Sequence, residues 1–449
     1  MNWRELQKKK VRVVGGAVSG GLDSCTVTHW LTAKGFEVHC FTVDLGQPDE
    51  ESLDAVADRM MACGAVDARI VPGQAALAEA GLKVVQALAG YEGGYWNTTG
   101  IARPVTTGAV LPELRKRGIG VLFHGATGRG NDQVRFQLAA NMLAPDVEVY
   151  APWRDPEFVA QFPGRKQMLD YCEANGLPIR SRREARYSTD ANFLGLTHEA
   201  GDLEDLTIPP FFVEPGMGVW PWDAPSSPES VSVRWEGGRP VAINGEAMDV
   251  VALFKAANRI AGRHGVGIGT HVVENRFVGV KSRGIYEAPA MELLTSAWEY
   301  LLQFVLDRRA REFFNEISAR IGLQIYQGYW LDLATTSALE ALKPIAALAT
   351  GTITVRLYKG KVYFEAADPI ARNGDIPNSL FTDDASMEAT GAYDHEDAEG
   401  FLKVLGVSAK NVGKIQFPGY ARPEDDRGVR PEANRKQGSR RPGRGRANR

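Results

Sequence analysis

The chain has 449 residues, of which 44% are hydrophobic and 24% are charged. That length and balance indicate two or three globular domains, each able to bury a core. No stretch approaches the roughly 20 apolar residues of a membrane helix, so no membrane-spanning segment is expected. The formal net charge of -3 excludes a partner that is bound by overall charge alone.

The charge is unevenly distributed. Residues 421–449 carry ten Lys and Arg against four acidic residues, a net +6, so the preceding 420 residues sum to -9. This last segment is rich in Pro, Gly and Arg and nearly free of apolar residues, which predicts a disordered basic tail. A solvated extension is the simpler interpretation of such a tail, and no nucleic-acid partner is expected.

Four cysteines stand at positions 25, 40, 63 and 172. Their spacing fits no C-x-x-C metal or redox motif. Few, scattered thiols in a large chain are typical of a reduced intracellular protein. The first residues lack the apolar run of a signal peptide, so the sequence predicts a cytoplasmic location.

Short apolar runs alternate with helical patterns through the first 175 residues. Strands are expected at 11–18, 37–44, 68–71, 119–125 and 147–153, and helices at 24–34, 50–63 and 75–89. This alternation predicts an α/β fold with a parallel sheet that is covered on both faces. Ligands of such sheets bind beyond the carboxyl ends of the strands, so chemistry is expected in the loops after residues 18, 43 and 123.

The pattern changes after about residue 176. Two hairpins are expected, turning at Gly237-Gly238 and at Lys359-Gly360. Amphipathic stripes at helical spacing predict three helices, of which the third is expected to stop at Gly322. Hairpins and helices in separate blocks indicate an α+β domain. The apolar stripes are interpreted as core, because amphipathic faces normally pack inward.

Residues 17–25 read AVSGGLDSC and connect the first strand to the first helix of the parallel sheet. Glycines at 20 and 21 let the backbone approach an anion closely, and the amides that open the helix point at it. The lysine of the GxxxxGK[ST] loop is missing. The segment SGGLDS resembles instead the loop of the N-type ATP pyrophosphatases, which cleave ATP between the α and β phosphates. That resemblance implies a reaction class but no substrate.

Three later blocks are dense in glycine and polar residues: 124–136, 187–205 and 263–289. The first offers Thr127, Asn131, Asp132 and Arg135 within nine positions. Such a set suits amino-acid recognition, with a guanidinium for a carboxylate and a carboxylate for an ammonium group.

These blocks resemble the argininosuccinate synthase family. The likeness runs from about residue 11 to about residue 400 and rests on LGQPDEE at 45–51, NTT at 97–99, HGATGRGNDQVRF at 124–136, APWR at 151–154 and ENRFVGVKSRGIYEAP at 274–289. The resemblance implies a nucleotide-binding domain (1–175), an α+β synthetase domain (176–385), a C-terminal arm that helps to build a homotetramer (386–420) and, beyond the family pattern, the basic tail (421–449).

The family's reaction would be the ligation of citrulline to aspartate through citrullyl-AMP, with release of AMP and pyrophosphate, in arginine biosynthesis. ATP would be a substrate and Mg²⁺ would neutralise its phosphates. No catalytic nucleophile and no metal held by the protein itself are expected. Two alternatives stay open: a paralogous AMP-forming ligase for another ureido or amine substrate, and a non-catalytic nucleotide-binding protein.

The resemblance also assigns site residues by matching motif. ATP would contact Ala17, Val18, Ser19, Gly20, Gly21, Leu22, Asp23, Ser24, Cys25, Val43, Gly125 and Asp190. Citrulline would contact Tyr95, Thr99, Arg103, Asn131, Arg135, Ser188, Thr197, Glu199, Glu274 and Tyr286. Aspartate would contact Thr99, Arg103, Thr127, Asn131 and Asp132.

The chain departs from the family pattern at three of these places. Cys25 stands where the phosphate loop usually ends in serine, and a thiol is a weaker hydrogen-bond donor than a hydroxyl. Val43 replaces the usual alanine, and Gly100 follows NTT where the family often has proline or serine.

Overall fold

The computed structural model describes residues 2–50, 52–127, 130–179, 186–274, 276–279, 281–368, 378–380 and 395–420. The chain divides into two compact units, Met1–Phe381 and Thr382–Arg449. The predicted tail at 421–449 lies outside the described residues. Within the described part of the chain, no helix is long and apolar enough to cross a membrane.

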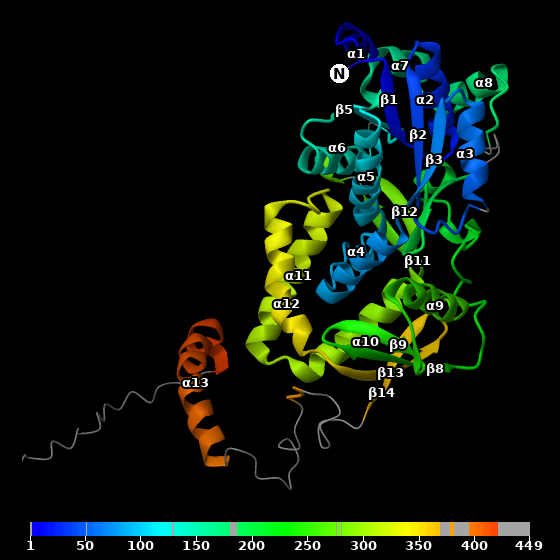
Figure 1. Cartoon of the computed structure of the whole chain (residues 1–449). Helices are drawn as coiled ribbons and strands as arrows, with labels where there is room; N and C mark the ends of the chain where they lie inside the picture. Colours follow the sequence, from blue (N-terminus) through cyan, green and yellow to red (C-terminus); the bar gives the residue numbers. More distant parts are fainter. Residues whose placement is uncertain are drawn as a thin grey trace, which may run out of the picture. The chain divides into compact units, whose positions relative to one another are not determined.

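A five-stranded parallel sheet forms the N-terminal part of the first unit (Figure 1), as predicted. Its order is β3-β2-β1-β4-β5, with strands at Asp67–Pro72, Glu37–Asp44, Val13–Ala17, Val121–His124 and Glu148–Tyr150. Every pairing within it is parallel. Because β1 and β4 are neighbours, the loops that follow residues 17 and 124 leave the sheet side by side.

Helices cover both faces of this sheet. On one face lie α2 (Leu22–Ala33), α3 (Leu53–Ala62) and α8 (Arg165–Ala174), and on the other lie α5 (Thr98–Lys116) and α6 (Asp132–Leu143). Alternate strand residues serve the two sides, since Val38 and Cys40 pack in the α2 core while Phe41 packs in the α5 core. Because both faces of the sheet are buried, its strands can carry nearly continuous apolar runs. The shorter helices α1 and α7 span Trp3–Lys8 and Pro156–Gln161.

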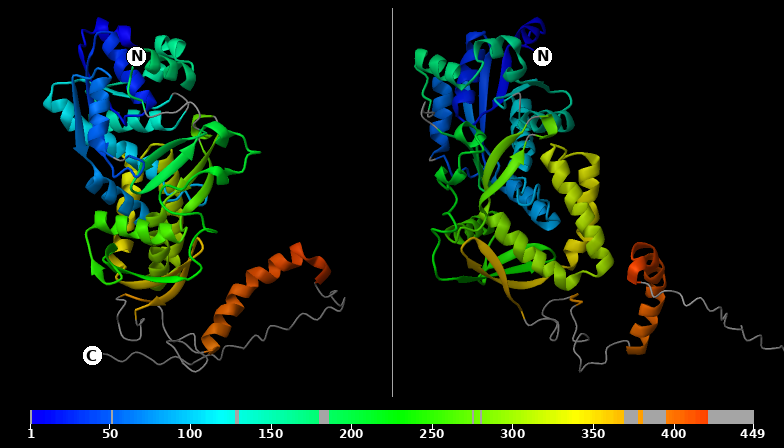
Figure 2. Two further views of the ribbon diagram at one scale, coloured as in Figure 1. Left: turned by 90° about the vertical axis from the view of Figure 1, so that its right-hand side faces the viewer. Right: turned by 180° about the vertical axis from the view of Figure 1, so that it is seen from behind.

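Helix α5 also contacts a second, antiparallel sheet of order β11-β12-β7-β6. Its strands are Ile268–Glu274, Ser282–Glu287, Gly195–Glu199 and Ser188–Asn192. Helix α5 therefore contacts both the parallel and the antiparallel sheet, and Figure 2 shows these elements from two further sides. The polar blocks at 187–205 and 263–289 supply all four strands of this sheet.

A third sheet, order β10-β9-β8-β13-β14, contains both predicted hairpins. Glu236 pairs with Arg239 across the first turn, and Tyr358 pairs with Lys361 across the second, so both turns are confirmed. Its strands span Glu246–Ala247, Arg239–Ile243, Glu229–Glu236, Gly351–Tyr358 and Lys361–Ala367. Helices α9 (Val250–Arg263) and α10 (Pro289–Val305) pack on it. Among the described residues, the other α-helices of this unit are α4 (Gln74–Ala87), α11 (Arg308–Tyr326) and α12 (Leu333–Leu348).

The expected stop at Gly322 is wrong. Helix α11 runs from Arg308 to Tyr326 and passes through this glycine. A Cβ atom at Gly322 would lie 2.2 Å from the carbonyl oxygen of Gly90. Glycine stands at position 322 because the backbone of α11 meets that of Gly90 there. The helix ends four residues later, at Tyr326.

The second unit contains α13 (His395–Gln416), followed by a 3₁₀ turn at Pro418–Tyr420. The helix is amphipathic, and its large apolar side chains are exposed within the unit: Phe401, Leu402, Val404, Leu405, Val407, Val412 and Ile415.

Candidate functional site

The phosphate-type loop bends sharply between β1 and α2. Gly20 has φ +74°, a left-handed conformation that favours glycine. The backbone N–H of Ser19 donates to Oγ of Ser24 at 3.0 Å, and Nη1 of Arg59 donates to the carbonyl of Gly20 at 2.9 Å. One serine and one buried guanidinium therefore fix the loop, and the first turn of α2 opens beside it.

Asp23 does not cap helix α2, because Gly21 occupies the N-cap position. Its Oδ1 atom accepts a hydrogen bond from Nε1 of Trp153 at 3.0 Å. Burial raises the pKa of this carboxyl, although the Trp153 hydrogen bond opposes the change. Asp23 is thus a carboxylate at the mouth of the loop with one oxygen engaged.

The Cys25 thiol faces the hydrophobic core beneath the loop. The residue is fully buried, and its Sγ atom lies 3.6 Å from the carbonyl oxygen of Gly20. A hydrogen bond with Cys63, and then burial, raise the pKa of this thiol. The backbone N–H of Cys25 donates to the carbonyl of Gly21 at 3.0 Å, so in this structure neither the thiol nor the amide of Cys25 faces an anion at the loop.

Gly125 joins the loop to a large cavity. A Cβ atom built on Gly125 would lie 3.2 Å from Cβ of Asp23, tighter than ordinary van der Waals contact. Gly125 is also a lining residue of the cavity. The contact between Asp23 and Gly125, here termed the loop seam, places the anion loop at the cavity's edge.

The cavity has a volume of about 570 Å³. Its walls come from the start of α5 with the segment before it, from the connection between β4 and α6, and from the antiparallel sheet. The lining residues are Tyr95, Thr99, Gly125, Ala126, Thr127, Gly130, Asn131, Asp132, Arg135, Asp190, Thr197, Glu199, Ala200, Glu204, Glu274, Lys281, Ser282 and Tyr286. A volume of this order fits small-molecule ligands.

Two arginines hold one aspartate at the base of the cavity. Oδ2 of Asp132 accepts from Nε of Arg103 at 2.8 Å, and its Oδ1 accepts from Nη1 of Arg135 at 2.8 Å. Arg103 also forms an ion pair with Asp190, and Arg135 donates to the carbonyl of Tyr326 at 2.9 Å. Burial alone would raise the pKa of Asp132, but the two guanidinium groups outweigh it and lower the pKa to about 2.

Three other carboxyl groups of the cavity show the opposite shift. Burial, followed by the charges of Glu274 and Asp190, raises the pKa of Glu199 to about 8. Burial also raises the pKa of Glu274 and, against the attraction of Arg103, that of Asp190. The cavity therefore brings together more carboxyl groups than its arginines can pair, which suits ligands with ammonium groups.

Two residues of the cavity have buried polar atoms that form no hydrogen bond within the described part of the chain. Thr197 and Arg135 are each 3% exposed. Among the described residues, Oγ1 of Thr197 and Nε of Arg135 have no hydrogen-bond partner. Because buried polar groups are normally satisfied, these two atoms indicate where a ligand binds.

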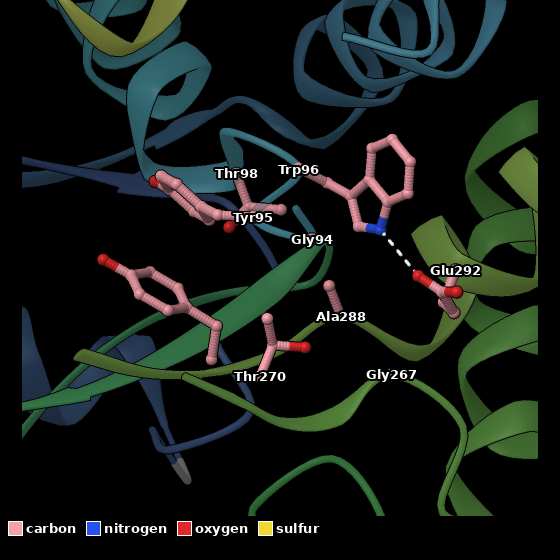
Figure 3. A pocket seen from close by; sticks show the side chains of 9 residues that line it. Gly94, Tyr95, Trp96, Thr98, Gly267, Thr270, Ala288 and Glu292 are labelled. Atoms are coloured by element: carbon pink, nitrogen blue, oxygen red, sulfur yellow. Dashed lines mark hydrogen bonds between the residues drawn. The ribbon is translucent and has the colours of Figure 1, made fainter. Parts of the chain in front are cut away.

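Two tyrosines form one wall. The rings of Tyr95 and Tyr286 lie 4.2 Å apart at 35°, and the Thr99 N–H donates to the Tyr95 hydroxyl at 3.2 Å. Burial raises the pKa of Tyr95 to about 12, so its phenol stays neutral. The same two tyrosines line a second cavity of about 10 Å³ (Figure 3). A hydrogen bond of 2.9 Å between Trp96 and Glu292 borders this space, which is the size of one water molecule.

The structure brings most of the residues expected from sequence into one place. Those that line the large cavity are Tyr95, Thr99, Gly125, Thr127, Asn131, Asp132, Arg135, Asp190, Thr197, Glu199, Glu274 and Tyr286. Arg103 bonds to two of them, and Ser188 pairs with Glu199 across β6 and β7. The residues of the loop at 17–25 do not line the cavity and reach it only at the loop seam. Val43 is buried at the end of the neighbouring strand β2.

Sequence reasoning missed other lining residues. Lys281 and Ser282 lie inside the motif at 274–289, and their charge and hydroxyl group could have identified them as site residues. Glu204 lies in a 3₁₀ turn, Gly201–Glu204, at the end of the polar block 187–205, and no residue of the family motif was matched to it.

Two family models match this chain. One is described as the arginosuccinate synthase N-terminal HUP domain and matches residues 12–178, and the other is described as the arginosuccinate synthase C-terminal domain and matches residues 187–412. Together they span the parallel sheet, the loop and the cavity.

Curated relatives are similar over nearly their whole length. Argininosuccinate synthase of Rhodopirellula baltica is 39% identical over 402 residues, covering 89% of this chain and 97% of that protein. Argininosuccinate synthase of Nitratidesulfovibrio vulgaris is 39% identical over 407 residues, covering 89% and 98%. A crystal structure titled as a predicted subunit of tRNA methyltransferase from Methanocaldococcus jannaschii aligns at a TM-score of 0.26 and 15% identity, over 36% of this chain and 76% of that one, a likeness too low to argue from.

Proposed function

Since this chain belongs to the argininosuccinate synthase family, we propose that its cavity joins citrulline to aspartate at the expense of ATP, with release of AMP and pyrophosphate. The observation that carries the proposal is the loop seam, which sets an anion-binding turn against a cavity rich in carboxylates and guanidinium groups. A ligase that activates one amino acid with ATP and joins it to another needs both features within reach of each other.

In the first step, the ureido oxygen of citrulline attacks the α-phosphorus of ATP, and pyrophosphate leaves. Residues 17–25 are proposed to hold the phosphates through the backbone amides at the start of α2 and the hydroxyls of Ser19 and Ser24, because the start of a helix favours negative charge. Val43 and Gly125 would lie beside the nucleotide, and Asp190 near it. The product of this step is citrullyl-AMP.

In the second step, the amine of aspartate attacks the activated carbon, and AMP leaves. Thr99, Arg103, Thr127, Asn131 and Asp132 are proposed to hold aspartate. Citrulline would be held by Tyr95, Thr99, Arg103, Asn131, Arg135, Ser188, Thr197, Glu199, Glu274 and Tyr286. The unpartnered Thr197 Oγ1 and Arg135 Nε support this assignment, since a citrulline carboxylate or ureido group would satisfy them. No residue is proposed to form a covalent intermediate.

Mg²⁺ is proposed to accompany ATP. The groups beside the loop are one carboxylate, Asp23, and the hydroxyls of Ser19 and Ser24. This donor set fits a cation whose other ligands are phosphate oxygens and water. The ion would neutralise charge on the triphosphate and on the departing pyrophosphate.

A homotetramer and a cytoplasmic location are also proposed. The exposed apolar side chains of α13 support assembly, because monomers rarely leave so much contiguous apolar surface uncovered. The four buried, unpaired cysteines support a reducing compartment. Measuring the mass of the full chain in solution would test the tetramer.

The decisive experiment is product identification. With ATP, Mg²⁺, citrulline and aspartate together, we expect argininosuccinate, AMP and pyrophosphate in equal amounts, and no argininosuccinate when either amino acid is left out. Nucleotide binding without turnover would support the non-catalytic alternative. Turnover only with a different ureido compound or amine, in a substrate panel scored by pyrophosphate release, would support the paralogous ligase.

A further inference from the structure

We propose that Glu199 is the general base of the ligation step, taking a proton from the ammonium group of the incoming aspartate. This inference rests on the proposed function and adds a catalytic role to a position so far assigned only to citrulline binding. It follows from where Glu199 stands, from the engagement of the neighbouring carboxylates, and from the proton that the reaction must remove.

Glu199 ends strand β7, and its side chain shares a face with that of Thr197, because alternate residues of a strand point the same way. Both residues line the large cavity. Backbone pairing sets Glu199 opposite Ser188 on β6 and opposite Gly284 on β12. Since the Thr197 hydroxyl is buried and unpartnered among the described residues, this face of β7 points to a ligand.

Three other carboxylates of the cavity are already engaged. Both oxygens of Asp132 accept hydrogen bonds from guanidinium groups, which lowers its pKa to about 2 and makes it a poor base. Asp190 is paired with Arg103. Glu274 is hydrogen-bonded to Tyr286.

Glu199 differs from these three. Among the described residues it forms no side-chain hydrogen bond and no ion pair, and only charge and burial act on it. Glu204 also lines the cavity, but its side chain is exposed. Glu199 is thus the half-buried carboxylate of this wall that has no hydrogen-bond partner among the described residues.

The surrounding charges tune its basicity. The acidic groups are Glu274 on β11, Asp190 on β6, Asp132 on α6 and Glu204 in the 3₁₀ turn. The cationic groups are Arg103 on α5, Arg135 on α6 and Lys281 before β12, and Tyr286 on β12 is neutral. Burial and then Glu274 dominate, so the pKa of Glu199 is raised to about 8. An ordinary carboxylate, with a pKa of about 4.3, would be a far weaker base toward an ammonium group.

The proton and electron balance is simple. Aspartate binds as its ammonium form, and one N–H proton moves to a carboxylate oxygen of Glu199. The freed lone pair forms the new C–N bond to the activated carbon of citrullyl-AMP, and the C–O bond breaks with its electron pair going to AMP. Citrullyl-AMP enters this step as a neutral isourea, having given one proton to pyrophosphate as it formed. The product guanidinium group therefore keeps the other two amine protons and one positive charge, and Glu199 returns its proton to solvent.

Glu199→Gln separates this role from citrulline binding. Exchange of labelled pyrophosphate into ATP, with citrulline present and aspartate absent, reports the first step alone. At saturating citrulline we expect the variant to keep the kcat of exchange within about threefold, with any lost citrulline contact appearing as a raised citrulline KM, and to lose argininosuccinate formation by about 100-fold or more. Glu199→Asp, which keeps a carboxylate, should recover part of that loss, and Glu274→Gln should instead raise the citrulline KM of both steps.

The pH profile gives a readout that a structural role would not move. In the unaltered enzyme, kcat/KM for aspartate should rise with pH and level off near pH 8. In Glu199→Gln it should keep rising, because only the free amine can then react, whereas Glu204→Gln should keep the inflection. Equal loss of exchange and ligation in Glu199→Gln, or an unchanged inflection, overturns the inference. Absence of exchange in the unaltered enzyme would instead overturn the proposed function.

Discussion

Arg135 connects three parts of the molecule through one side chain. It binds Asp132 on its own helix, reaches the carbonyl of Tyr326 at the end of α11, and leaves Nε for a ligand. Only a planar guanidinium offers donors in these three directions at once. The residue therefore couples the position of α11 to the substrate pocket.

Arg135→Lys should raise the citrulline KM by about tenfold or more, because lysine keeps the charge but loses hydrogen bonds worth about 1.5–3 kcal/mol each. Affinity for ATP should stay within about twofold, since Arg135 does not touch the loop at 17–25. Citrulline-dependent pyrophosphate exchange measures the first quantity, and calorimetric titration with ATP measures the second.

A matched control is Arg311→Lys, which alters an arginine paired with Glu299 away from the cavity. It should change neither the citrulline KM nor the ATP affinity. Equal weakening of citrulline and ATP binding by Arg135→Lys would contradict the assignment of Arg135.

Individual site residues were predictable where they sit in a recognisable motif. Asn131, Asp132 and Arg135 lie within five positions, so their side chains reach one place through a single loop and helix turn. Glu204 lies in a turn that Arg283 holds by donating to the carbonyl groups of Leu203, Asp205 and Ile208. That placement depends on contacts about 80 residues apart, which no local pattern contains.

At the scale of elements, α11 and α5 show how a residue's usual preference is overruled by packing. Gly322 lies inside α11 because its missing side chain makes room for the backbone of Gly90. Helix α5 contains Pro104 and Pro112, residues that normally interrupt helices. This helix was not predicted, although it supports both the parallel and the antiparallel sheet.

Gly322→Ala should therefore destabilise the protein by about 1–3 kcal/mol through overpacking, although alanine ordinarily stabilises a helix by about 1 kcal/mol over glycine. Gly108→Ala in α5 is the matched control, because a Cβ atom there meets only Leu143 at an ordinary 3.6 Å. In thermal unfolding, the midpoint should fall for Gly322→Ala and rise for Gly108→Ala. A midpoint for Gly322→Ala at or above that of the unaltered chain would contradict the contact.

The strands of the antiparallel sheet were also not predicted. Strands β6 and β11 read as polar blocks because their cavity faces carry Asp190 and Glu274 where a packed sheet would carry apolar residues. Functional side chains thus removed the alternation by which a strand is recognised. The parallel strands keep their apolar runs, since nothing on them but their ends touches the site, and all five were predicted.

At the scale of the whole molecule, the unliganded cavity holds like charges close together. A carboxyl whose pKa is higher in the folded than in the unfolded chain favours folding at low pH, and this contribution is lost as pH rises to the folded-state value. For Glu199 the relevant window runs from about 4.3 to about 8. The unliganded protein should therefore be less stable at pH 8 than at pH 6.

Thermal midpoints measured between pH 6 and pH 8 without substrates test this expectation. The fall of the midpoint from pH 6 to pH 8 should be smaller in Glu199→Gln, which has no titrating group at position 199. It should be unchanged in Glu312→Gln, because the Glu312 carboxylate is 63% exposed. An identical fall in Glu199→Gln and the unaltered protein would show that its carboxyl does not titrate in this range.

The loop seam limits what can stand at position 125. Asp23 lies in the first turn of α2 and Gly125 in the connection from β4 to α6, and a Cβ atom on Gly125 would lie 3.2 Å from Cβ of Asp23. A methyl group at position 125 therefore requires the Asp23 side chain or the Gly125 segment to shift by a few tenths of an ångström. Because the loop at 17–25 and the cavity meet only here, position 125 is where a single added carbon atom would disturb both the nucleotide subsite and the amino-acid subsites proposed above.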